Sequence, residues 1–158
     1  MPDEPGRMFR WTSDYAVGVP EIDRDHRTLF ALADCLHQAM LEGRGKHALE
    51  SLLADLAAYT DEHFRREEEV MAARAYPDAA EHRRQHQGLQ RAVHMFQARF
   101  GRGEATMTIE LMQFLWRWLQ QHTTTSDRRI GEHLRRSRQP AQVTGGAAGG
   151  VPAWPPEE

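Results

Sequence analysis

The chain has 158 residues, a usual size for one domain with a buried core, and its charge is nearly balanced, with 20 Lys and Arg against 23 Asp and Glu. This balance gives no reason to expect nucleic acid or an anionic membrane surface as the partner. No apolar run approaches the ~20 residues that span a bilayer, and the N-terminus lacks the features of a secretory signal, so we expect a cytoplasmic protein without membrane insertion.

Residues 1–18 are mixed in composition and contain prolines and three scattered aromatic residues, Phe9, Trp11 and Tyr15. Aromatic rings bury a large apolar surface even in an irregular segment. We therefore expect an N-terminal arm that packs onto the domain through these rings and forms no helix of its own.

The first amphipathic helix is predicted to begin at Pro20, which suits the first turn of a helix, and to end at Gly43. Apolar residues recur along it at helical spacing, and His26 falls on the same stripe. The single cysteine, Cys35, lies in this apolar pattern. We expect it to be a small buried hydrophobic residue and not a reactive thiol.

Three further amphipathic helices are predicted. The second ends before Tyr76-Pro77, and the third begins after an N-cap at Asp78. The fourth opens with Thr106 or Thr108 as its N-cap. No segment alternates apolar and polar residues over a useful length, so the sequence predicts an all-α protein.

Short Gly or Pro turns between such helices predict an up-down-up-down antiparallel four-helix bundle over residues 19–136. From residue 137 to residue 158 the composition changes to Pro, Gly, Ala and Gln. We expect this last segment to be a disordered tail.

Histidine and acidic side chains lie on the inward stripe of every predicted helix. Residues four apart on a helix share a face, so His63 with Glu67, and His82 with His86, can each aim two donors at one spot. Neighbouring helices run in opposite directions, which brings all of these positions to one end of the bundle. The residues are His26, His63, Glu67, His82, His86, His122 and Asp127.

Five imidazoles and two carboxylates suit two transition-metal ions and are too rich in nitrogen for calcium or magnesium. The alternative is a buried polar network without metal. His122 and Asp127 depart from the pattern, because a step of five residues turns two side chains ~140° apart on an ideal helix. Both can serve one centre only if Asp127 reaches across or the helix is locally distorted, and the sequence leaves both possibilities open.

This ordered set of motifs resembles the bacterial hemerythrins, which are four-helix bundles with a non-haem di-iron centre that binds O2 reversibly. The resemblance extends from about Phe9 to about Leu134. It is carried by GVPEIDRDH at 18–26, HFRREE at 63–68, Tyr76-Pro77, HRRQH at 82–86 and WLQQH at 118–122, followed by Asp127.

The resemblance implies a ligand set. Glu67 and Asp127 would bridge two iron ions, together with a hydroxide or oxide. His82, His86 and His122 would bind one iron, and His26 with His63 would bind the other. Six donors then surround the first iron and five the second, which leaves one open position for O2. The identity of the metal as iron rests on the resemblance, since zinc, cobalt or manganese would also suit these donors.

Four side chains are expected to surround O2 at the open position. Phe64 and Leu119 match apolar pocket residues of the family, and Trp118 is expected to back them. Thr123 departs from the family pattern, in which Ile or Val usually follows this histidine. A hydroxyl there would hydrogen-bond the bound ligand or admit water, so we expect faster autoxidation than in a relative with Ile.

The expected function is reversible O2 binding without turnover, for storage, delivery or sensing, by a monomer. A membrane-associated oxygen-consuming enzyme is a candidate receiver of the O2. The alternative is a di-iron redox enzyme that acts on peroxide or nitric oxide at the same centre. A third interpretation, an interaction module with a structural metal, would require a closed site without an exchangeable position.

Overall fold

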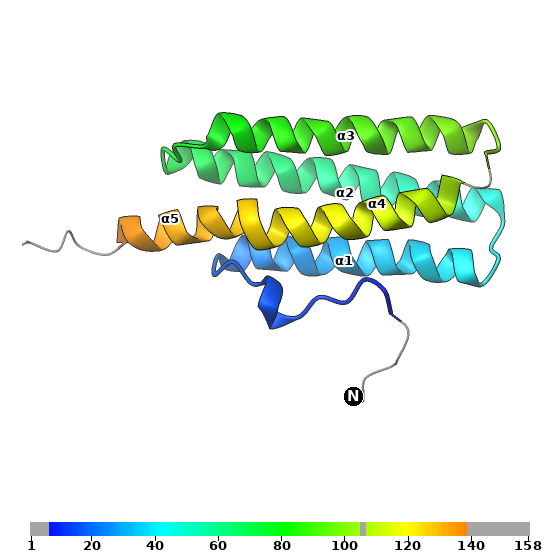
Figure 1. Cartoon of the computed structure of the whole chain (residues 1–158), viewed down its shortest axis with the longest axis horizontal. Coiled ribbons are helices and arrows are strands. Elements are labelled where there is room, and N and C mark those ends of the chain that lie inside the picture. The colour runs from blue at the N-terminus through cyan, green and yellow to red at the C-terminus, as the bar shows by residue number, and fades with distance from the viewer. Residues whose placement is uncertain (1–6, 105–106, 139–158) are drawn as a thin grey trace, which may run out of the picture.

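The computed structural model describes residues 7–104 and 107–138. Four long helical segments lie antiparallel in a bundle, as predicted (Figure 1). The elements are α1 (Pro20–Leu41), α2 (Lys46–Ala73), α3 (Ala79–Gly101) and α4 (Met107–His122), which a π-helical turn, η2 (Thr123–Asp127), joins to α5 (Arg128–Arg138). The described ranges contain no β-strand, and none of their helices is long and apolar enough to cross a membrane.

The helix ends follow local chemistry in most places. Pro20 occupies the first turn of α1, and Gly43, just beyond its last turn, adopts a φ of 67°, a left-handed value that favours glycine. Asp78 stands at the N-cap of α3, but its side chain makes no capping hydrogen bond, contrary to the prediction. Thr106 lies outside the described residues, and Thr108 lies inside α4.

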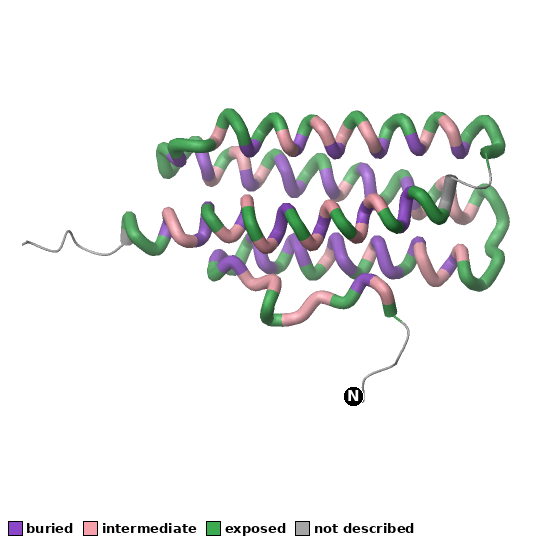
Figure 2. Tube along the Cα trace, viewed as in Figure 1, coloured by how far each residue is buried: buried purple, intermediate pink, exposed green. Residues whose placement is uncertain are grey.

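Apolar side chains form two clusters, and buried positions face the interior of the bundle along every helix (Figure 2). The larger cluster fills most of the bundle, with Phe30, Leu56, Val93 and Leu115 among its members. The smaller cluster lies around the beginning of α1, the end of α2 and α5. Its buried members are Val17, Val19, Ile22, Met71, Tyr76, Ile130 and Leu134.

The arm before α1 is bound to the bundle by its aromatic rings. Phe9 is buried, and its ring meets that of Trp116 edge-on at a centroid distance of 5.7 Å. Trp11 and Tyr15 are partly buried against the larger cluster, and Ser13–Tyr15 forms one 3-10 turn, η1. Residues 1–6 of the predicted arm and residues 139–158 of the predicted tail lie outside the described residues.

The expectation for Cys35 is wrong, because this residue is exposed on α1. It lies between Ala33 and Leu36, which are both buried. At ~100° per residue, Cys35 points away from both of them. An apolar segment therefore does not make each of its members an inward-facing residue.

Gly131 in α5 allows a close approach to the arm. A Cβ atom at this position would lie 1.9 Å from the carbonyl oxygen of Val17 and 2.9 Å from its carbonyl carbon. Backbone atoms cannot rotate away as a side chain can, so Gly131→Ala should lower the free energy of unfolding by about 1–3 kcal/mol, as overpacking usually does. Urea unfolding of the two proteins measures this change.

Gly88→Ala is the matched control for this substitution. Gly88 lies inside α3, and an added Cβ would meet nothing within 4 Å. Alanine at an unhindered helical position should raise the free energy of unfolding by about 0.5–1 kcal/mol. Changes of the same sign at the two glycines would contradict the steric argument.

Candidate metal centre

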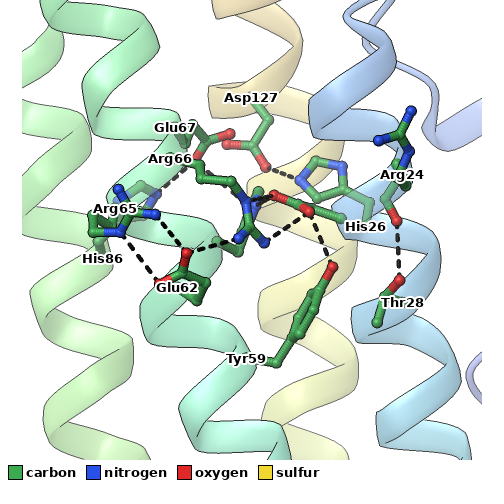
Figure 3. Close-up of polar contacts among 12 residues, drawn as sticks. Arg24, His26, Thr28, Tyr59, Glu62, Arg65, Arg66, Glu67, His86 and Asp127 are labelled. Carbon is green, nitrogen blue, oxygen red and sulfur yellow. Dashed lines mark hydrogen bonds and ion pairs between the residues drawn. The ribbon is translucent and has the colours of Figure 1, made fainter.

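All seven side chains that the sequence places on the inward stripes come together in the bundle, and each is no more than 5% exposed. They come from α1, α2, α3, the end of α4 and η2. Figure 3 shows Glu67, His86, Asp127 and His26 directed into the space between the helices. A single helix could not assemble these donors, so the bundle itself forms the site.

The seven residues form two groups whose donor atoms lie within 4.8 Å of one another. The first group holds Glu67, His82, His86, His122 and Asp127, and the second holds His26, His63, Glu67 and Asp127. Both groups contain the same two carboxylates. Two carboxylates shared between two histidine sets are suited to bridging a pair of metal ions.

Asp127 enters the site because η2 is a π-helical turn. A π-helical turn accommodates one residue more than an α-helical turn, so a side chain five residues after His122 returns to the inward face. One oxygen of Asp127 lies 2.9 Å from Nε2 of His122, and the other lies 3.0 Å from Nε2 of His26. The helix is thus locally distorted, and the carboxylate also lies between histidines of three helices, since Nε2 of His82 is 3.1 Å away.

Several donor atoms of the site are buried without a hydrogen-bond partner. Nε2 of His86 lies 2.9 Å from Oε2 of Glu67, yet the two atoms do not have hydrogen-bond geometry. Leaving such groups unpaired in the interior is costly. The described atoms in this condition at the site are both ring nitrogens of His26, Nε2 of His86 and His122, Oε1 of Glu67 and Oδ1 of Asp127. Imidazole and carboxylate donors that converge without pairing fit transition-metal ions well.

The charges of the site also favour cations. Burial raises the pKa of Glu67 and of Asp127, but the surrounding histidines outweigh burial and hold both pKa values below their ordinary values. Burial lowers the pKa of His82, but the neighbouring carboxylates of Asp127 and Glu67, 3.1 and 3.2 Å from its Nε2, raise this pKa to about 9. Without metal, protons on histidines therefore balance the carboxylates, and a metal ion would have to displace them.

Sequence reasoning missed the residues that hold the histidines from behind. Nδ1 of His63 lies 3.0 Å from Oδ2 of Asp25, and Nδ1 of His86 lies 3.0 Å from Oε1 of Glu68. Both carboxylates adjoin a candidate ligand in the sequence, Asp25 before His26 and Glu68 after Glu67. Their position next to the motifs was the available signal, but it does not indicate which histidine each one contacts.

Two of the four residues predicted to form the O2 pocket, Phe64 and Trp118, stack on histidines of the first group. The ring of Phe64 stacks on His86 at a centroid distance of 3.7 Å, and that of Trp118 stacks on His122 at 4.2 Å. Leu119 is buried in the larger apolar cluster, and Thr123 is 1% exposed at the start of η2. Apolar side chains therefore enclose the three-histidine group on the side of α2 and α4.

Comparison with known proteins gives consistent matches. Residues 17–134 match the family model described as the hemerythrin HHE cation binding domain. A bacteriohemerythrin of Stenotrophomonas maltophilia is 30% identical over 81% of this chain and 82% of its own length. One from Methylococcus capsulatus is 29% identical over 80% of this chain and 97% of its own length. A crystal structure of wild-type hemerythrin, 28% identical, matches 79% of this chain and 96% of that chain with a TM-score of 0.74.

Proposed function

This chain belongs to the hemerythrin family, of the bacteriohemerythrin type, and we propose that it binds O2 reversibly at a non-haem di-iron centre, for storage, delivery or sensing. The observation that carries the proposal is the pair of histidine groups that share Glu67 and Asp127. A mononuclear or purely structural site would need only one such group.

The residues divide between two iron ions as the two groups do. His82, His86 and His122 would hold one ion, His26 and His63 the other, and both carboxylates would bridge them with a hydroxide or oxide. When bound, the ions supply electrons and one open coordination position for O2. The bundle supports this chemistry by burying the donors and by packing the rings of Phe64 and Trp118 against two of the histidines.

The composition of the ligand set favours binding over oxygenation. Di-iron oxidases of the ferritin-like type use a carboxylate-rich set, with Glu from two helices and Glu-x-x-His from two others. Here five histidines accompany only two carboxylates in the two groups. We expect this set to stabilise the lower oxidation states that reversible O2 binding uses.

The test is a spectrum of the reduced, iron-quantified protein without O2, after O2 addition and again after degassing. Two irons per chain and a visible band that appears with O2 and disappears on degassing are expected. A band that decays directly to the oxidised state would contradict reversible binding. Absence of iron would overturn the di-iron centre itself.

Thr123 should influence how long the oxygenated state survives. Its hydroxyl is buried directly after His122, where it can bond a bound ligand or water. One hydrogen bond is worth ~1 kcal/mol, so Thr123→Ile should slow autoxidation by about fivefold. The decay of the visible band measures the rate.

Thr124→Val serves as the control for Thr123→Ile. The Thr124 hydroxyl belongs to the same π-helical turn but donates to the carbonyl oxygen of Gln120 at 2.6 Å. Its loss should leave the autoxidation rate unchanged. A rate unaffected by Thr123→Ile, or changed equally by both substitutions, would count against a role for the Thr123 hydroxyl.

One observation favours the alternative, a di-iron redox enzyme that acts on peroxide or nitric oxide. A surface pocket of about 490 Å³ extends to the rim of the centre and would admit a small polar substrate. It is lined by Gln85, Trp118, Gln121, His122, Thr125, Ser126 and Arg129. Catalytic consumption of peroxide or nitric oxide by the iron-loaded protein would favour this function over O2 binding.

We further propose that the chain is a cytoplasmic monomer that passes O2 to an oxygen-consuming enzyme at a membrane. Its near-balanced charge supports a freely diffusing protein. Within the described ranges, the exposed large hydrophobic residues are Leu41, Met95 and Ile109. Sedimentation at several protein concentrations should give one species with the mass of a single chain.

A further inference from the structure

Asp25 is a buried carboxylate, and both of its oxygens have hydrogen-bond partners. Its Oδ2 lies 3.0 Å from Nδ1 of His63 and accepts a hydrogen bond from Nε of Arg66 at 2.9 Å. Its Oδ1 accepts from Nη2 of Arg66 at 2.9 Å and from the hydroxyl of Tyr59 at 3.0 Å. Tyr59 and Arg66 approach from α2 (Figure 3). Asp25 is therefore fixed in place and joins α1 to α2 beside the second histidine group.

The surroundings of Asp25 keep it ionised. Nε and Nη2 of Arg66 donate to its two oxygens at 2.9 Å each, so a proton on either oxygen would face an N–H donor. The two parallel bonds from Arg66 are the strong, charge-assisted kind. An ionised carboxylate can only accept hydrogen bonds.

The ionised state of Asp25 determines the tautomer of His63. Because Asp25 can only accept, Nδ1 of His63 carries the proton, and the lone pair of the neutral ring is on Nε2. Nε2 is the atom that faces the centre, 3.8 Å from Oε2 of Glu67. A carboxylate bonded to the far nitrogen of a histidine also makes the near nitrogen a stronger donor.

The two histidine groups differ in this respect. In the second group, Nδ1 of His26 has no hydrogen-bond partner within the described part of the chain, so His63 is the histidine that a carboxylate orients. In the first group, Glu68 has the corresponding contact with His86. The side chain of Glu68 is 28% exposed and that of Asp25 only 9%. Solvent therefore weakens the contact between Glu68 and His86 more than the contact between Asp25 and His63.

We propose that Asp25 is a positioning residue for the two-histidine metal position, where it fixes the His63 tautomer and strengthens the Nε2 donor, while Arg66 and Tyr59 hold Asp25 in place. This inference rests on the proposed di-iron function and deepens it, because this position is the one that would keep a coordination site open for O2. Asp25 itself contacts no reacting atom.

Two substitutions of Asp25 separate the effect of its hydrogen-bond acceptors from the effect of its charge. Asp25→Leu removes every acceptor at similar size, whereas Asp25→Asn keeps the shape and a neutral acceptor but removes the charge. Glu68→Leu is the matched control, because it removes the acceptor of His86 in the other group. Two readouts apply to all variants: ¹H–¹⁵N spectra of the histidine rings in the metal-free protein at alkaline pH, and titration with Co²⁺.

The wild-type protein should show His63 as the Nδ1–H tautomer and two Co²⁺ binding steps. Asp25→Leu should mix the tautomers of His63 and weaken one step by about 10–100-fold, the usual cost of losing such a partner. Asp25→Asn should keep the tautomer and weaken the same step less. Glu68→Leu should change the His86 signals and leave those of His63 unchanged.

A single Nδ1–H tautomer in Asp25→Leu, or an equal weakening of both Co²⁺ steps, would overturn the inference. If Asp25→Leu does not fold, Arg66→Gln removes the paired donors from a partly exposed side chain and should weaken the same Co²⁺ step. Unchanged binding in that variant would equally overturn the inference. Fewer than two Co²⁺ per wild-type chain would instead contradict the di-metal site, whatever the His63 tautomer.

Discussion

Replacing Glu67 with glutamine should lower the iron content of the purified protein from two ions per chain, one for each donor group, to at most one. Glu67 is fully buried and belongs to both groups, so its loss affects both positions. Glutamine has nearly the same shape, but its amide nitrogen has no lone pair for a metal and its oxygen carries no full charge. Iron affinity should fall by more than about 100-fold, beyond the cost of removing an outer partner.

Glu69→Gln is the control for this change. Glu69 lies two residues further along α2, its side chain is 63% exposed, and it pairs with Arg65 at the surface. The substitution removes the same charge from the same helix and should leave two irons per chain. The measurement is the iron content of the wild type, Glu67→Gln and Glu69→Gln after identical loading with iron. A Glu67→Gln variant that retains both ions would exclude Glu67 as a bridge.

Helix periodicity predicts the inward faces of this protein well. The apolar stripes predict that His26, His63 and His82 face inward, and all three are buried in the bundle. Two facts suffice for that inference, the repeat of ~3.6 residues per turn and the antiparallel order that short turns enforce. Both can be read from the chain without knowledge of distant contacts.

Asp25 shows where this reasoning stops. It lies one residue before His26, about 100° around the helix. Its side chain therefore points between the core and one of the neighbouring helices. The stripes do not determine the hand of the bundle, so they do not indicate which helix that neighbour is. Its contacts with Tyr59, His63 and Arg66 depend on α2 lying on that side.

The π-helical turn marks a second limit. The five-residue step from His122 to Asp127 is visible in the sequence, and it signals that an ideal helix cannot serve both residues. Whether the chain adjusts its backbone or its side chains depends on the packing beyond the step. Ile130 and Leu134 are buried in the smaller cluster, and the extra residue in η2 keeps them on the inward face together with Asp127.

Removing the metal should loosen one end of the bundle and leave the other folded. The centre lies between the two apolar clusters. The smaller cluster, at the end of the bundle beyond the centre, has far fewer buried members than the larger one. Without metal, Glu67 and Asp127 are neighbouring buried carboxylates that repel each other. Amides of α5 and the end of α2 should lose at least ~100-fold in hydrogen-exchange protection, or about 2.8 kcal/mol of opening free energy.

Protons on the histidines replace the metal in part, which gives this loosening a pH dependence. The pKa of His82 is raised to about 9 in the metal-free fold, so its contribution to stability is complete below ~6.5 and is lost as the pH rises through 9. Loosening should therefore increase from neutral to alkaline pH. Amides around Leu36 and Val93, inside the larger cluster, are the internal control and should stay protected. A uniform loss of protection in both clusters would mean that the metal stabilises the whole bundle and not only the end that holds it.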